Sequence, residues 1–268
     1  RDALPEHMFA LLAATAGVGG ETITGDPITA LPTMVSSEDS VFGEAHWTFT
    51  INRALADMHR GATGEALPAR FELDTWTPDA ILGLCWPAIY AALGSALIEG
   101  NYPVIEGLLS AVHLDHTARL YVDVDDLLGE DGSTQLTVVA RTTGLDESSA
   151  GRVVTVQEAL YHDGQEIGFF QERFAIRGRI GSDSVPVDVP AAAGLAAGVT
   201  DTPRSQLRRA RVVAPANMTT FANVSGDFNP IHTSYAAARV AGLEDALVHG
   251  MWLSAVAQNL VEAREGKQ

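Results

Sequence analysis

The feature that most constrains this chain is an uncharged, largely apolar run at residues 80–98, bounded by Asp79 and Glu99. As a helix, the run would be long enough to cross a lipid bilayer. However, it contains Pro87, two glycines and a serine, and its flanks are acidic, whereas spanning helices are typically bordered by basic residues. A helix that is apolar on nearly all sides is otherwise expected to be enclosed by protein. We therefore predict a buried helix inside a globular domain.

The segments after this run have the pattern of antiparallel strands. Strand-like sequences, alternating or rich in Val and Thr, occur at residues 113–124, 135–143, 152–161 and 167–176. The last two are separated by Asp163 and Gly164, a dipeptide that favours the two-residue type I′ turn of a hairpin. One long buried helix followed by an antiparallel meander predicts an α+β fold in which the helix packs against the sheet.

Composition narrows the possible partners and the compartment. The chain has 17 Lys and Arg against 34 Asp and Glu, for a formal net charge of -17. A surface this acidic repels phosphate backbones and anionic lipids, so we expect no nucleic-acid or membrane partner. The single cysteine, Cys85, cannot form an internal disulfide, and no signal peptide is visible at the start. Both observations favour a reducing compartment, and we expect a cytoplasmic location.

Two short motifs near the end of the chain carry the chemistry. Residues 225–232 read SGDFNPIH, and residues 247–252 read LVHGMW. This pattern resembles the MaoC-like, (R)-specific hydratase/dehydratase family of hot-dog folds. The family signature is Asp-x-Asn-Pro-x-His, followed by a His-Gly step that opens the central helix. The residues that match it at the family's spacing are Gly226, Asp227, Asn229, Pro230, His232, His249 and Gly250.

The resemblance extends to an earlier part of the chain. Residues 84–96, LCWPAIYAALGSA, resemble the helix of the non-catalytic first hot dog in the dehydratase region of actinobacterial and fungal type I fatty acid synthases. The resemblance implies an α+β fold of tandem hot dogs, each an antiparallel sheet wrapped on a long central helix. Family hot dogs continue with strands after that helix, so we expect the second one to be truncated at Gln268.

The expected domain organisation follows from this resemblance and from a connector rich in Ala, Gly, Val and Pro at residues 181–203. We predict a connecting segment of unknown role at residues 1–70, a non-catalytic first hot dog at 71–180, a linker at 181–206, and the start of the catalytic hot dog at 207–268.

The residue types in the motif suit the removal of water from a 3-hydroxyacyl thioester. That reaction needs a base for the proton on the α-carbon and an acid for the departing hydroxyl. The ordinary pKa of histidine, about 6.5, makes neutral His232 a candidate base. Asp227 lies five residues earlier across a proline-containing turn. If it is partly buried, its pKa is expected to rise, so that it can donate a proton. Asn229 could hold either group in register through its amide.

The remaining site residues concern the thioester carbonyl and possible ligands. The backbone N–H of Gly250, at a helix start, is expected to stabilise the enolate oxygen. His249 is interpreted as structural or pocket-lining. We expect no metal and no organic cofactor. His113 and His116 resemble a metal-binding pair, but positions three apart on a regular strand face opposite sides, which disfavours ligation.

Two aromatic residues in the expected apolar helix have two possible roles. Trp86 and Tyr90 are expected to fill the core, with lining of an acyl groove as the second possibility. Cys85 on the same helix is expected to pack in the core.

The function expected from the resemblance is dehydration of 3-hydroxyacyl carrier-protein thioesters to trans-2-enoyl thioesters, by a hydro-lyase that is part of a type I fatty acid synthase. The implied partners are acyl carrier protein or an acyl-CoA thioester, and the remainder of the synthase polypeptide, in a homo-oligomeric parent complex. Two alternatives stay open, namely a free-standing (R)-specific enoyl-CoA hydratase and a catalytically incomplete scaffold or acyl-binding fragment.

Overall fold

A computed structural model describes residues 4–64, 76–98, 102–103, 111–148, 151–176 and 211–259 of the chain. The elements in chain order are α1 (Leu4–Thr15), β1 (Met34–Val35), β2 (Glu44–Asn52), α2 (Arg53–Gly64), α3 (Pro78–Leu82), the 3₁₀ turn η1 (Gly83–Cys85), α4 (Trp86–Ser95), β3 (Leu97–Ile98), β4 (Tyr102–Pro103), β5 (Ala111–Leu120), the 3₁₀ turn η3 (Val124–Leu127), β6 (Ser133–Ser148), β7 (Gly151–His162), β8 (Gln165–Ile176), α5 (Thr219–Ser225), α6 (Pro230–Thr233), α7 (Tyr235–Val240) and α8 (Gly250–Gln258).

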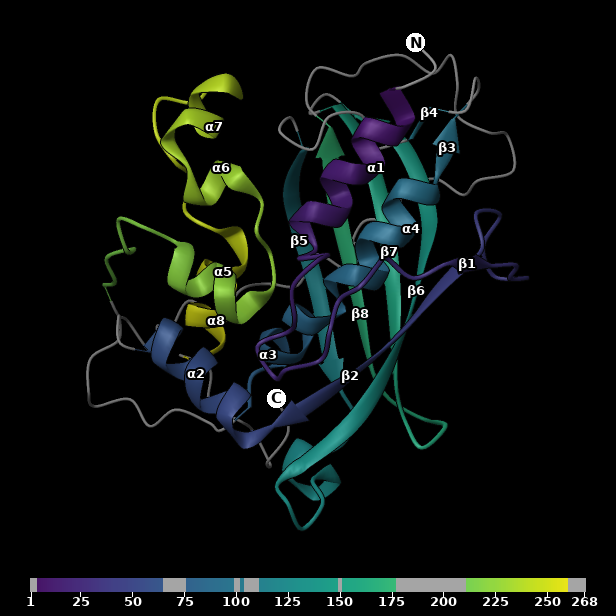
Figure 1. Ribbon diagram of the computed structural model, residues 1–268, viewed down its shortest axis with the longest axis vertical. Coiled ribbons are helices and arrows are strands. Elements are labelled where there is room, and N and C mark those ends of the chain that lie inside the picture. Colours follow the sequence, from purple (N-terminus) through teal and green to yellow (C-terminus); the bar gives the residue numbers. More distant parts are fainter. Residues whose placement is uncertain are drawn as a thin grey trace, which may run out of the picture.

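The main sheet has six strands in the order β1-β2-β6-β7-β8-β5, all paired antiparallel. Helix α4 packs against this sheet, and α1 packs on α4 from the other side, so α4 lies between a sheet and a helix (Figure 1). Every residue from position 78 to position 94 is buried. The expected α+β arrangement, with a buried apolar helical segment packed against an antiparallel sheet, is confirmed.

The apolar run does not form one continuous helix. It forms α3, then the turn η1, then α4, with Pro78 and Pro87 in the first turns of α3 and α4. Proline has no backbone N–H and is tolerated at a first turn, where that donor has no helical partner. Within the described residues, no helix is both long and apolar enough to cross a membrane.

The hairpin predicted from Asp163 and Gly164 is present between β7 and β8. Both residues have positive φ, 48° for Asp163 and 76° for Gly164. Positive φ at both central positions is the requirement of a type I′ turn, whose twist matches the flanking strands. The turn therefore fixes the pairing of two long strands from a purely local signal.

Residues near the N-terminus contribute more than a connection. Strand β2 pairs with β6 over eight residue pairs, from Ala45 opposite Ala140 to Asn52 opposite Ser133. The main sheet thus includes residues from the 1–70 segment, which we predicted to be a connecting segment. The linker expected at 181–206 lies outside the described residues.

Strand β5 contains an irregularity that corrects the expected direction of its side chains. His113 pairs with Phe174, Asp115 pairs with Arg173 and His116 pairs with Glu172, so Leu114 is an extra residue in the ladder. Such a bulge shifts the alternation by one position. His113 and His116, predicted to face opposite sides, therefore share one face, and their rings stack with centroids 5.6 Å apart.

The described residues after position 210 form the helices α5 to α8, which lie together beside the sheet (Figure 1). Helix α5 contacts α2 and α3, and α8 contacts the same two helices. The indole Nε1 of Trp252 in α8 donates to the carbonyl oxygen of Ala62 in α2 at 3.0 Å. The helix predicted to start at Gly250 is thus anchored on the first half of the chain.

Candidate active site

The loop between α5 and α6 carries the first motif and buries its carboxyl group. Gly226 ends α5 with a left-handed φ of 70°, and the following Asp227 is only 6% exposed. Oδ1 of Asp227 accepts the backbone N–H of Asn229 at 2.9 Å and the hydroxyl of Tyr90 at 3.4 Å. The carboxylate is therefore fixed both by its own loop and by the central helix α4.

The side chain of Asn229 has a different position from the one expected. Its Oδ1 accepts the backbone N–H of Ile231 at 3.3 Å, which caps the start of α6. This cap satisfies a donor that a helix start otherwise leaves without a partner. Asn229 thus acts on the site by orienting the short helix that carries His232.

Two imidazole rings lie beside the carboxylate. Nε2 of His249 is 2.8 Å from Oδ2 of Asp227, and its Nδ1 accepts the backbone N–H of Met251 at 3.3 Å. An Nδ1 that accepts a hydrogen bond directs the ring proton to Nε2, toward the carboxylate. The His249 and His232 rings have centroids 4.3 Å apart.

The ring of His232 is oriented by a backbone carbonyl. Its Nδ1 lies 3.1 Å from the carbonyl oxygen of Leu247. A carbonyl oxygen only accepts, so Nδ1 carries the proton and Nε2 of the neutral ring keeps its lone pair. This is the tautomer that a base acting through Nε2 requires.

The charges in the site favour an ionised Asp227 and a neutral His232. Burial opposes the charge on Asp227, but contacts with His249, the nearby His232 and the Asn229 amide outweigh it and lower the pKa of Asp227 to about 2. Burial, together with repulsion from His249, lowers the pKa of His232 to about 4. The expectation that burial would raise the pKa of Asp227 is wrong, because two imidazole rings and a backbone N–H beside the carboxyl favour its ionised form.

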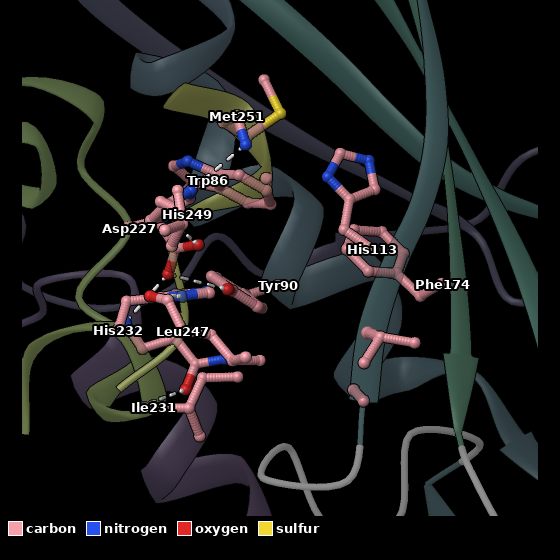
Figure 2. A pocket seen from close by; sticks show the side chains of 15 residues that line it. Trp86, Tyr90, His113, Phe174, Asp227, Ile231, His232, Leu247, His249 and Met251 are labelled. Atoms are coloured by element: carbon pink, nitrogen blue, oxygen red, sulfur yellow. Dashed lines mark hydrogen bonds and ion pairs between the residues drawn. The ribbon is translucent and has the colours of Figure 1, made fainter. Parts of the chain in front are cut away.

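A cavity of about 220 Å³ opens on these groups, and both halves of the chain line it. Figure 2 shows Asp227, His232 and His249 on one side, with His113 and Phe174 across from them. Trp86 stacks on Tyr90 with ring centroids 5.3 Å apart, and both rings are buried and line the cavity. The two roles considered for these aromatic residues, core filling and groove lining, are therefore combined.

Helix α8 begins at Gly250, on the cavity wall. A Cβ added to Gly250 would meet no atom within 4 Å, so glycine leaves open space in front of the helix start. The N-terminus of a helix carries a partial positive charge and outward-pointing N–H groups. This arrangement suits an oxygen that gains negative charge.

Within the described residues, two groups of side chains have donor atoms close enough to hold a metal ion. One consists of Asp227, His232 and His249, and the other of His113, His116 and Glu172. In the first group the contacts above already occupy the carboxylate, both ring nitrogens of His249 and Nδ1 of His232. Sequence reasoning missed the contact between Tyr90 and Asp227, which are 137 positions apart, because no local pattern encodes it.

The fold, with Asp227 and His232 at the wall of one cavity, defines a hot-dog protein with a candidate acid–base site, and comparison with known proteins supports this fold. Residues 198–268 match the family model described as MaoC like domain. The fold resembles the crystal structure of a MaoC-like dehydratase from Phytophthora Capsici, with a TM-score of 0.56, 15% identity, and coverage of 81% of this chain and 73% of that chain. The resemblance to a MaoC-like hot-dog protein is confirmed.

Curated relatives match a short segment of the chain. It is 47% identical over 51 residues to "Fatty acid synthase beta subunit TOXC" of Cochliobolus carbonum, and 40% identical over 57 residues to "3-hydroxyacyl-[acyl-carrier-protein] dehydratase, mitochondrial" of Arabidopsis thaliana. These segments cover 19% and 21% of the chain, and 2% and 34% of the respective relatives. The chain therefore spans well under half the length of either relative.

Proposed function

We propose that this chain belongs to a hydro-lyase that converts 3-hydroxyacyl carrier-protein thioesters to trans-2-enoyl thioesters, as part of a type I fatty acid synthase. The observation that carries the proposal is the pairing of a buried, ionised Asp227 with a neutral His232 at the wall of one cavity. The similarity to a fatty acid synthase beta subunit and to a carrier-protein dehydratase supports the synthase context and the carrier-protein substrate.

In the proposed reaction, Nε2 of His232 takes the proton from the α-carbon of the substrate. The C–H electron pair forms the new double bond as the bond from the β-carbon to the hydroxyl oxygen breaks. The resulting imidazolium returns its proton to the departing hydroxyl, which leaves as water. The Asp227 carboxylate accepts a hydrogen bond from the hydroxyl and stabilises the positive ring. The amide of Gly250 and the helix dipole of α8 stabilise the charge on the thioester oxygen.

The test is hydration of a crotonyl thioester, followed by the loss of enoyl absorbance, with the wild type, Asp227→Asn and His232→Ala. Acid–base groups of this kind typically contribute about 10²- to 10⁴-fold, so each variant is expected to lose at least about 100-fold in kcat. The matched control is His46→Gln, because His46 is a half-exposed histidine that also lies beside a carboxylate, Glu44. Activity that survives both site substitutions would remove the catalytic assignment.

The assay is made on this chain and on a longer polypeptide that contains it, because the matched segments cover only 2% and 34% of the relatives' lengths. Comparing CoA with carrier-protein thioesters separates the synthase proposal from a free-standing (R)-specific enoyl-CoA hydratase. Thioester binding without turnover in both polypeptides would favour the scaffold or acyl-binding alternative.

A further inference from the structure

A second group of buried ionisable side chains lies on the inner face of the sheet, outside the proposed acid–base pair. It consists of Asp79 on α3, His113 and His116 on β5, and Glu172 on β8, with Glu158 on β7 as a neighbour. The side chains of Asp79 and Glu172 are 1% and 0% exposed, and those of His113 and His116 are 17% and 11% exposed.

The bulge at Leu114 brings this group together. Because it puts both histidines on the face that holds Glu172, one ligand atom each from His113, His116 and Glu172 lies within 4.8 Å of the others. Nε2 of His113 contacts Oε2 of Glu172, and Nε2 of His116 lies 3.2 Å from Oδ1 of Asp79. Two ligands bound tetrahedrally at about 2.0–2.2 Å from one zinc ion are roughly 3.4 Å apart.

The two glutamates of this group have fewer hydrogen bonds than Asp227 has. Among the described residues, neither oxygen of Glu158 has a hydrogen-bond partner, and Glu172 has only the contact of its Oε2 with Nε2 of His113, although both glutamate side chains are fully buried. A buried carboxyl group without donors is costly unless a cation or a proton neutralises it. The two histidines supply nitrogen ligands at the place where this negative charge gathers.

We propose that His113, His116 and Glu172, with Asp79 as a fourth ligand, bind one divalent transition-metal ion, for which Zn²⁺ is the probe. Imidazole and carboxylate ligands in a four-coordinate arrangement are typical of zinc. His113 also lines the cavity, which gives an ion a route to the site.

The site would link the sheet to the helices of the second motif. Nε2 of Gln258 in α8 donates to Oδ1 of Asp79 at 2.5 Å, and Oγ of Ser254 in the same helix lies 3.1 Å from Nε2 of His116. An ion held by Asp79 on α3 and by His113, His116 and Glu172 on the sheet would fix α3 against β5 and β8. Through the contact of Gln258 with Asp79 it would also restrain α8. Its role is therefore structural, separate from the proton transfers proposed for His232.

The test is a titration of the metal-free chain with Zn²⁺ in competition with a chromophoric chelator. The wild type is expected to bind one ion per chain with micromolar or tighter affinity, and its thermal unfolding midpoint should rise. His113→Gln and Glu172→Gln are each expected to weaken binding at least tenfold. His46→Gln, at the exposed His46–Glu44 pair, and His232→Gln, in the other cluster, should bind as the wild type does.

Three results would overturn the proposal. They are no binding by the wild type, unchanged affinity in both His113→Gln and Glu172→Gln, or loss of binding in His232→Gln. Circular dichroism checks that each variant is folded. If the histidine variants fail to fold, Co²⁺ in the wild type decides, because a four-coordinate site with imidazole ligands gives intense visible absorption bands and their absence rejects the site. The readout is metal binding, so it does not depend on the proposed dehydratase activity.

Discussion

A Cβ atom on Gly226 would lie 2.6 Å from the carbonyl oxygen of Gly83, so the loop that carries Asp227 crosses η1 with no room for a side chain. Gly226→Ala should therefore lower the free energy of unfolding by about 3 kcal/mol, from the left-handed φ together with overpacking. Gly242→Ala is the matched control, because Gly242 has a φ of 80° but nothing within 4 Å of its Cβ position. It should lose only about 1 kcal/mol. Equal losses in denaturant unfolding would contradict the close crossing.

The lowered pKa of His232, about 4, predicts an unusual pH dependence. The base acts in its neutral form, so activity is lost only as the pH falls through the folded-state pKa. Between pH 7 and pH 5, kcat/KM should change by less than about twofold. A histidine with the ordinary pKa of about 6.5 would lose more than tenfold over this range. The pH profile of crotonyl thioester hydration measures the difference.

His249 accounts for part of the lowered pKa of His232, because protons on both neighbouring rings would repel each other. In His249→Gln the acid limb of the kcat/KM profile should move to higher pH, because one cause of the lowered pKa is removed. A titration of the His232 ring by NMR in the same variant gives an independent reading. An acid limb that stays in place, or moves to lower pH, would count against this coupling.

The hydroxyl of Tyr90, on helix α4, donates a hydrogen bond to Oδ1 of Asp227, so Tyr90 is a positioning residue for that carboxylate. Tyr90→Phe keeps the ring and removes one long hydrogen bond of 3.4 Å, worth about 1 kcal/mol, so kcat should fall about fivefold. The KM for the thioester should change little. Tyr235→Phe on α7 is the control, because Tyr235 is 61% exposed. A Tyr90→Phe enzyme with full kcat would show that the contact does not position Asp227.

The bulge in β5 predicts that one residue of the strand is dispensable. Leu114 pairs with no residue of β8 and is 41% exposed, so its deletion leaves the pairing of His113 with Phe174 and of His116 with Glu172 intact. Deletion of Thr117, which pairs with Gln171, would instead reverse the side-chain directions on one side of the gap. Unfolding by denaturant should show a stable first variant and a severely destabilised second one.

Several parts of the fold could be read from the sequence because their signals are local. The Asp163-Gly164 turn requires only two residues that tolerate positive φ. The buried helical segment is indicated by nineteen consecutive uncharged positions at residues 80–98. The bulge at Leu114 could not be read, because an ordinary alternating pattern continues through it and only the pairing with β8 reveals the shift.

The candidate site was predictable in its residues but not in its electrostatics. The spacing of the motif residues predicted Asp227 and His232 as site residues, and in the structure both side chains line one cavity. The direction of the pKa shift of Asp227 depends on contacts with His249 and on an amide hydrogen bond, which spacing does not give. Burial alone predicts the opposite direction.

The cavity has one wall from the central helix of the first half and another from the helices of the second half, joined where Tyr90 meets Asp227. If recombination replaced one half with that of a homologous protein, the new half would contribute a cavity wall that does not match the wall formed by the other half. If the cavity holds the substrate as proposed, both halves determine substrate preference, and we expect them to diversify as a matched pair rather than as interchangeable modules.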